Sequence, residues 1–130
     1  MNPYYKIKQY VTKAEQESRP LELTETVKLL TCVKEISNEK ELIHKIICLV
    51  TLISDEEEQV GSLTQRESQI FNLIGCGFTS EDIAGMLTIS KSTVGTHRKN
   101  IIKKLNLNGS GRLKSVAYKR TQEIIAKSKN

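Results

Sequence analysis

Proline occurs only at positions 3 and 20 of this 130-residue chain, so no proline interrupts the backbone from residue 21 onward. Proline breaks the interior of a helix because it lacks a backbone N–H donor and its ring meets the preceding turn. Its absence leaves most of the chain free to be helical. Apolar residues in this stretch recur at steps of three and four, the period of an amphipathic helix. The sequence therefore predicts an all-α fold.

The overall composition is that of a folded protein without a membrane span. Hydrophobic residues make up 38% of the chain, and no window approaches 18 consecutive apolar positions. The N-terminus lacks the apolar core of a signal peptide. We therefore expect a soluble, cytoplasmic protein with no membrane association. The cysteines, Cys32, Cys48 and Cys76, form no CxxC pair, so we expect three buried thiols rather than disulfides or a metal site.

Charge is distributed unevenly along the chain. Residues 1–60 hold 8 Lys and Arg against 11 Asp and Glu, a balance of −3, whereas residues 61–130 hold 12 against 4, a balance of +8. A strongly basic half joined to a mildly acidic half indicates that one end of the chain meets a polyanion. Nucleic acid is the usual polyanion, although charge alone leaves a merely solvated surface equally open.

The N-terminal half, residues 1–59, is predicted to be a helical, hairpin-like extension. Residues 3–18 are polar and form a short helix or an ordered arm, and a first amphipathic helix starts at Thr24. Asn38 and Glu41 have the spacing of a capping box, so a second helix is expected over 38–54. That helix is apolar on nearly every side, so it needs cover from the C-terminal half or from a second copy of the chain. We therefore expect this half to mediate dimerisation or partner docking.

The C-terminal half, residues 60–130, is predicted to form four helices. The first opens with the capping box of Thr64 and Glu67, and the second spans 79–87. Ser90 caps a third helix that runs to about residue 105, and a fourth covers about 111–126.

The second and third of these helices have the spacing of a helix-turn-helix. Such a motif needs a small residue where the helices cross, an apolar residue in the turn, and an apolar residue that faces back from the second helix. Ala84, Ile89 and Val94 supply these at spacings of five and five. Thr88 stands in the turn where many such motifs have glycine.

The third helix is predicted to have two faces. At 100° per residue, Val94, Ile101 and Leu105 fall on one side, which we expect to be buried. The opposite side contains an exposed stripe, and no acid occurs between residues 91 and 120. A solvated helix normally mixes Glu with Lys, so the absence of acids favours a polyanion partner. The stripe consists of Ser92, Thr96, Lys99 and Lys103.

Residues 63–120 resemble the LuxR/GerE-type (NarL/FixJ-like) DNA-binding domain of bacterial transcription regulators. The matching residues are LTQRE at 63–67, Gly77, Ser80, IA at 83–84, Leu87, IS at 89–90, TV at 93–94, HRKNI at 97–101 and KL at 104–105. The resemblance implies a four-helix domain whose third helix enters the major groove of DNA and whose fourth helix often forms a dimer contact.

The resemblance also implies a set of DNA-binding residues. Gly95, Thr96 and Lys99 correspond to positions that contact bases. Lys91 belongs to the same DNA-binding set, and the positions at or near the phosphate backbone are Ser92, Thr93, His97, Arg98, Asn100 and Lys103. Base contacts specify sequence, whereas phosphate contacts fix the register and dominate the salt dependence of binding.

Two positions depart from the family pattern. Gly95 has no side chain where relatives often have a polar or basic one, which implies either close backbone approach or fewer residues for base recognition. Gln69 stands in place of a carboxylate common in the family's first helix. Regulators of this type usually have a sensory domain before the DNA-binding domain, and a phospho-receiver needs a cluster of acids. Because residues 1–60 contain a single aspartate, Asp55, we expect no receiver there.

The leading functional hypothesis is a dimeric, sequence-specific regulator of transcription that binds double-stranded DNA. Its homodimer would form through the 38–54 helix, the 111–126 helix or both, and it would associate with the nucleoid. The alternative is a protein similar to sigma region 4, or an adaptor, which docks on RNA polymerase or on another regulator. Enzymatic activity is not expected, because no nucleophile, base or phosphate-binding loop is recognisable. No cofactor or metal is expected either.

Overall fold

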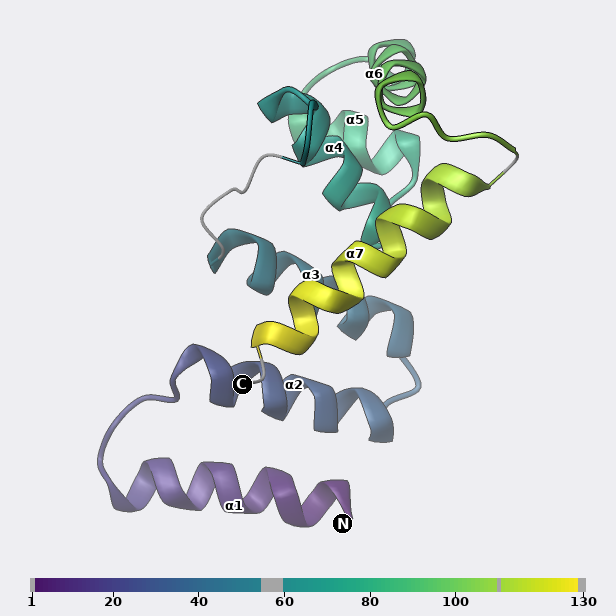
Figure 1. Ribbon diagram of the computed structural model, residues 1–130. Coiled ribbons are helices and arrows are strands. Elements are labelled where there is room, and N and C mark those ends of the chain that lie inside the picture. The colour runs from purple at the N-terminus through teal and green to yellow at the C-terminus, as the bar shows by residue number, and fades with distance from the viewer. Residues whose placement is uncertain (1, 55–59, 110, 129–130) are drawn as a thin grey trace. The chain divides into compact units, whose positions relative to one another are not determined.

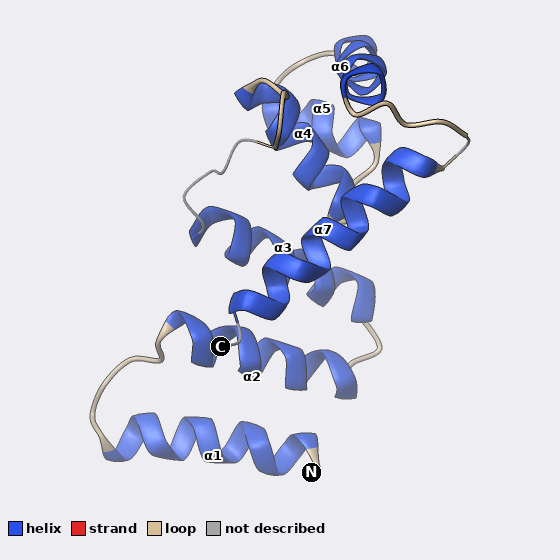
Figure 2. Ribbon diagram, in the orientation of Figure 1, coloured by secondary structure: helices blue, strands red, loops and turns tan. Residues whose placement is uncertain are grey.

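The computed structural model describes residues 2–54, 60–109 and 111–128 (Figure 1). Across these ranges the chain forms seven helices and no strand, so the predicted all-α fold is confirmed (Figure 2). In the part of the chain that the structure describes, no helix is long and apolar enough to cross a membrane. The helices group into two compact units. One unit contains residues up to 54 together with those from 124 onward, and the other spans 55–123.

The first unit begins with α1 (Pro3–Gln16) and α2 (Leu23–Ile36). Asn2 caps α1 by accepting the Tyr4 N–H at 2.9 Å, and Pro3 fits at the first helical position because its missing N–H is not needed there. Arg19 in the connecting loop donates two hydrogen bonds of 2.9 Å to the Glu25 carboxylate. These bonds lower the pKa of Glu25 to about 2. The loop is thereby fixed to the first turn of α2.

Helix α2 lies between α1 and α3 (Lys40–Ser54) and contacts both (Figure 1). Its Val27 and Cys32 side chains are buried, as are Ile47 and Cys48 of α3. The predicted start of α3, with Asn38 as its cap, is wrong by one residue, because Glu39 is the residue before the helix. The helix begins at Lys40, and its first backbone bond runs from the Ile43 N–H to the carbonyl of Glu39.

Helix α3 is only partly covered. Although Ile47, Cys48 and Thr51 are buried, Leu42 remains 55% exposed and Ile46 40% exposed. The two exposed residues are four positions apart and therefore lie on one side of the helix. An apolar strip of α3 thus stays in contact with solvent. The end of α7, from Ile124, belongs to this same unit.

The second unit consists of α4 (Gln65–Gly75), α5 (Ser80–Leu87), α6 (Lys91–Lys104) and most of α7 (Arg112–Ser128). The four predicted helices are confirmed, and the reciprocal capping box of Thr64 and Glu67 is present. The core of this unit is formed by residues that are at most 5% exposed. These are Leu63, Ile70, Phe71, Ile74, Cys76, Ile83, Val94, Ile101, Leu113 and Ala117.

Helices α4 and α7 approach closely at Gly75. A Cβ at this position would overlap the carbonyl of Ala117 and the hydroxyl of Thr121. Gly75 is the last residue of α4. Glycine is needed at this position because the backbone of α7 occupies the space that a side chain would fill. All three cysteines are buried, as predicted.

Candidate nucleic-acid interface

The second unit contains a helix-turn-helix made by α5 and α6. Thr79 caps α5 in a reciprocal box with Asp82, and the buried Ile83 fixes this helix on the core. Helices α5 and α6 contact each other, and α6 also contacts α4. The predicted inward-facing residue of the second helix, Val94, is completely buried. The helix-turn-helix geometry inferred from residue spacing is therefore present.

The turn between the two helices depends on an unusual backbone conformation at Thr88. This residue adopts the left-handed region, with φ of 57° and ψ of 46°. The N–H groups of Thr88 and of Ile89 both bond to the carbonyl of Ala84, which closes the end of α5. A β-branched residue is disfavoured in this region, because its Cβ comes close to the following carbonyl. Thr88 is thus strained at the position where the sequence lacks the common glycine.

Ser90 begins α6 and orients its first turn. The Ser90 Oγ accepts the Thr93 N–H at 3.1 Å and lies 2.8 Å from Thr93 Oγ1 and 3.0 Å from Ser92 Oγ. This cluster satisfies a backbone donor that would otherwise be unpaired at the helix start. It also places three hydroxyl groups together at the beginning of the helix.

Helix α6 has the two faces that the sequence predicts, except that Leu105, expected on the buried side, is only half-buried just after the end of the helix. Val94 and Ile101 are 0% exposed and anchor it to the core. The opposite stripe of Ser92, Thr96, Lys99 and Lys103 is exposed along its whole length. Because the stripe lies on a helix fixed from behind by buried residues, its side chains are presented from a rigid scaffold.

All ten residues proposed as DNA contacts lie on α6. Lys91, Ser92, Thr93, Thr96, Lys99, Asn100 and Lys103 are exposed, whereas Gly95, His97 and Arg98 are half-buried. The half-buried positions are those at the edges of the buried stripe. The structure therefore brings the whole set together on one accessible surface, although not every member is equally accessible.

Gly95 faces open space. A Cβ built at this position has no heavy atom within 4 Å. Packing inside the protein therefore does not require glycine here, and a larger side chain would enter solvent. Any need for glycine at this position must come from a partner that approaches the helix.

The α6 surface is positively charged, and one acid, Glu81 of α5, lies close to it. Lys91 Nζ lies 3.1 Å from Glu81 Oε1, and both side chains are more than 60% exposed. An exposed ion pair of this kind contributes little to stability. Lys91 can therefore exchange Glu81 for another anion at small cost. Within the described residues, no group of three His, Cys, Asp or Glu side chains could hold a metal ion.

An ion pair that the sequence interpretation missed fixes the other end of α6. Lys104 Nζ lies 2.5 Å from Glu67 Oε1, and Glu67 is 2% exposed. The ammonium group of Lys104 and the N–H of Thr64 lower the pKa of the Glu67 carboxyl. No sequence pattern marks this pair, because its members are 37 positions apart. Glu67 was recognised only as a helix cap.

Comparison with known proteins identifies the region that contains this surface. Residues 61–117 match the family model described as "Bacterial regulatory proteins, luxR family". The chain is 38% identical over 81 residues, 62% of its length, to an uncharacterized response regulatory protein YgeK of Escherichia coli, of which the match covers 55%. It is 35% identical over 65% of its length to a nitrate/nitrite response regulator protein homolog of Haemophilus influenzae, covering 41% of that protein.

A third relative is much longer than this chain. The HTH-type transcriptional regulator MalT of Vibrio cholerae is 34% identical over 57% of the chain, and the match covers 8% of that protein. The chain thus matches less than two thirds of the length of each of these curated relatives. No solved structure gives a significant match.

Proposed function

Residues 61–117 are a helix-turn-helix domain of the luxR family of bacterial regulatory proteins, and from this premise we propose a specific function. The chain acts as a sequence-specific transcription regulator that binds double-stranded DNA, with α6 in the major groove. It is a DNA-binding protein rather than an enzyme, and it works in the bacterial cytoplasm at the nucleoid.

One observation supports this function above all others. The outer stripe of α6 is exposed, contains hydroxyl groups and lysines, and has no acid, while Val94 and Ile101 behind it are completely buried. The width of the major groove admits an α-helix. In this proposal Thr96 touches a thymine methyl, Lys99 reaches guanine O6 or N7, and Gly95 allows close backbone approach. Phosphates are bound by Lys91, Ser92, Thr93, His97, Arg98, Asn100 and Lys103.

The proposed regulator binds as a homodimer. The exposed strip of Leu42 and Ile46 on α3 supplies one self-complementary surface. A second surface lies on the DNA-binding unit, where a groove of about 260 Å³ is lined by Gly111, Lys114 and the half-exposed Tyr118, among others. Light scattering on the purified chain measures the mass directly. A monomer at all concentrations, with and without DNA, would exclude this arrangement.

Control of the proposed regulator does not involve aspartyl phosphorylation in its N-terminal helices. Residues 1–54 contain no aspartate, and their described part is entirely helical between short loops. We assign these helices to dimerisation or partner docking, with the domain boundary near residue 60.

A second candidate function uses the same helices differently. In this alternative the chain is an adaptor, similar to sigma region 4, that docks on RNA polymerase or another regulator. The exposure of Leu42 and Ile46 favours it, because an uncovered apolar strip suits a protein partner. Leu42→Ser with Ile46→Ser would then abolish partner binding without changing the mass of the free chain.

Selection of binding sites from a random pool of DNA duplexes tests the leading function. The expected result is one enriched sequence, arranged as two half-sites whose spacing reflects the symmetry of the dimer. A pool with no enrichment, from protein that still binds duplexes, would remove sequence specificity from the proposal. Enrichment of a single half-site would remove the dimer.

A further inference from the structure

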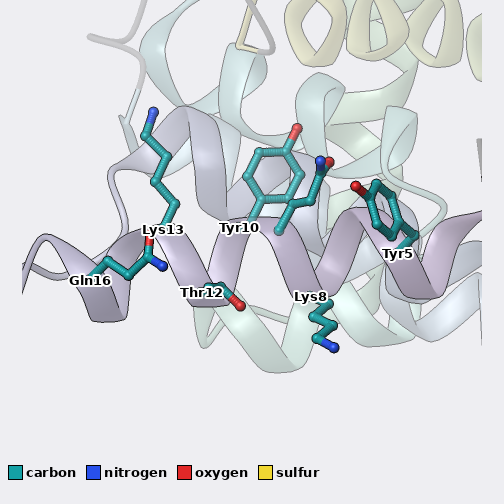
Figure 3. Close-up of a pocket in the computed structure, with 7 residues that line it drawn as sticks. Tyr5, Lys8, Tyr10, Thr12, Lys13 and Gln16 are labelled. Carbon is teal, nitrogen blue, oxygen red and sulfur yellow. The ribbon is translucent and has the colours of Figure 1, made fainter.

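Helix α1 presents a polar surface on the side opposite to α2. Pro3, Ile7, Tyr10 and Ala14, none of them exposed, follow steps of four, three and four and form the side packed on α2. A groove of about 550 Å³ follows the rest of the helix surface and reaches Tyr10 at the border of the packed side (Figure 3). The residues that line it are Tyr5, Lys8, Gln9, Tyr10, Thr12, Lys13 and Gln16.

The lining of this groove is chemically uniform. Each of its seven side chains is a hydrogen-bond donor, and none is an acid. In Figure 3, Lys13 and Tyr10 extend to one side of the helix and Lys8 to the other, with Gln16 at one end. Lys, Thr, Gln and Tyr are among the residue types that bind phosphate oxygens in DNA complexes. The groove therefore has the chemistry of a phosphate-binding surface.

The charge of α1 differs from that of the segment that follows it. Residues 1–14 contain three lysines and no acid. Residues 15–60 contain 5 Lys and Arg against 11 Asp and Glu, a balance of −6. Lys8 and Lys13 are both exposed, and Lys13 lies near enough to Glu25 of α2 to help lower the pKa of that carboxyl. The three lysines of α1 outnumber its single acid, Glu15, so the helix surface around the groove is positively charged.

We propose that the α1 groove binds the phosphate backbone of double-stranded DNA without reading bases. The proposal rests on the function assigned to α6, which brings DNA to the protein. Lys8 and Lys13 neutralise phosphates, and the hydroxyl and amide groups between them donate hydrogen bonds to phosphate oxygens. This contact is a second DNA-binding surface on the chain, separate from the helix-turn-helix.

A lipid surface is a less suitable partner for the same groove. A helix that lies on a membrane buries an apolar face among the lipid chains. The apolar residues Ile7 and Ala14 of α1 are on the side that packs on α2, and donor side chains line the groove instead. The ammonium, hydroxyl and amide groups of the groove can exchange their hydration for phosphate oxygens, and the lining includes no Leu, Ile, Val, Met or Phe side chain to insert among lipid chains.

The test measures the salt dependence of DNA binding by the full chain. Lys8→Gln and Lys13→Gln, alone and together, are titrated with a selected duplex and a scrambled duplex at several salt concentrations. Each phosphate contact contributes about 0.9 to the slope of log K against log salt. Each single variant should therefore lower the slope by about one, and the double variant by about two, equally for both duplexes.

The control variant is Lys40→Gln, which removes the same charge from an exposed residue at the start of α3. It should leave the slope unchanged. In wild-type protein, duplex DNA should also protect Lys8 and Lys13, but not Lys40, from an amine-reactive reagent. Circular dichroism of each variant verifies that the helices remain folded.

Three results would overturn the proposal. The first is a salt slope of DNA binding that is unchanged in the double variant. The second is an equal loss of salt slope in Lys40→Gln. The third is binding to anionic phospholipid vesicles that depends on Lys8 and Lys13, together with DNA binding that does not depend on them. Binding that depends on Lys99 and Lys103 alone would reject the α1 contact but keep the proposed function. Wild-type protein that binds no duplex at all would reject both.

Discussion

Lys104, in the last turn of α6, forms an ion pair of 2.5 Å with Glu67, the residue that completes the cap of α4. The Glu67 carboxylate thus caps the start of α4 and also binds the last turn of α6. Its Oε1 atom accepts both the Thr64 N–H at 2.9 Å and the Lys104 ammonium group. The position of α6 is therefore coupled to α4 by charge as well as by the burial of Val94 and Ile101.

This ion pair predicts a pH-dependent contribution to stability. Because the pKa of Glu67 is lowered in the folded state, its contribution is complete above the ordinary value of 4.5 and is lost as the pH falls through the lowered pKa. Glu67→Gln should lower the free energy of unfolding by about 1 kcal/mol at neutral pH, as expected for a partly exposed charged hydrogen bond. The difference should shrink below pH 4.5. Urea unfolding at several pH values measures it.

The exposed pair of Glu81 and Lys91 supplies the control for this experiment. Glu81→Gln should change stability by less than about 0.5 kcal/mol at any pH, because both side chains are largely in solvent. If Glu67→Gln behaves in the same way, Glu67 does not fix α6.

The strained turn predicts a stabilising substitution. Thr88→Gly removes the Cβ from a left-handed residue and should raise the free energy of unfolding by about 0.5–1 kcal/mol, after the greater flexibility of glycine in the unfolded chain is taken into account. Asn106, with φ of 52°, is the matched control, because asparagine tolerates this region better than threonine. Asn106→Gly should give a smaller gain. A loss of stability in Thr88→Gly would mean that the threonine side chain contributes more than its backbone strain costs.

The close approach of α4 and α7 predicts opposite results for two helical glycines. Gly75→Ala forces a methyl group against the Ala117 carbonyl and should destabilise the protein by about 1–3 kcal/mol. Gly85→Ala, in α5, meets nothing within 4 Å and should stabilise it by about 1 kcal/mol through helix propensity. Thermal unfolding of both variants compares them directly. Equal stabilities would show that α7 can move away from α4 without cost.

The Gly95→Ala variant tests the stability of α6 separately from its proposed binding to DNA. Gly95→Ala should stabilise the free protein by about 1 kcal/mol, as at Gly85, because the added methyl group meets open space. If the backbone approaches the bases at this position, the same change should weaken binding to the selected duplex about tenfold, which is about 1.4 kcal/mol. Unchanged affinity would show that the α6 backbone does not approach the bases closely at this position. Gly95 would then matter only because it has no side chain to contact a base. Gly85→Ala controls for the effect on stability.

The exposed stripe predicts two classes of DNA-binding variant. Lys99→Ala and Thr96→Ala should weaken binding to the selected site more than to scrambled DNA, because a good base contact contributes about 1–3 kcal/mol of discrimination. Lys103→Ala should weaken binding to both about equally and lower the salt slope by about one unit. Titrations on both duplexes measure the two effects. Equal proportional losses in all three variants would contradict the assignment of base contacts.

Local patterns in the sequence were sufficient to predict most of the second unit. Thr64 and Ser90 cap helices where the residue types and spacing indicate, because a cap involves groups only two or three positions apart. The buried side of α6 followed from Val94 and Ile101 in the same way. The gathering of the ten candidate residues on one surface therefore needed no information about tertiary contacts.

Long-range contacts were beyond prediction from the sequence. The pair of Glu67 and Lys104 depends on how α6 crosses α4, and the requirement at Gly75 depends on a carbonyl of α7. The start of α3 was misplaced by one residue, because the folded turn makes Glu39 rather than Asn38 the acceptor of the first helical N–H, that of Ile43. Three lysines and no acid over residues 1–14 indicate a positively charged start of α1, but no local pattern shows that Tyr5 and Tyr10 line a groove there.

The contact of Gly75 with α7 also has a consequence for synthesis on the ribosome. Helices α1, α2 and α3 pack on their neighbours in sequence, as do α5 and α6, so each pair can form soon after it emerges. Helix α4 differs, because the surface around Gly75 is covered only after Ala117 and Thr121 of α7 have been synthesised. Until those residues leave the exit tunnel, the nascent unit has α5 and α6 in place but an open core.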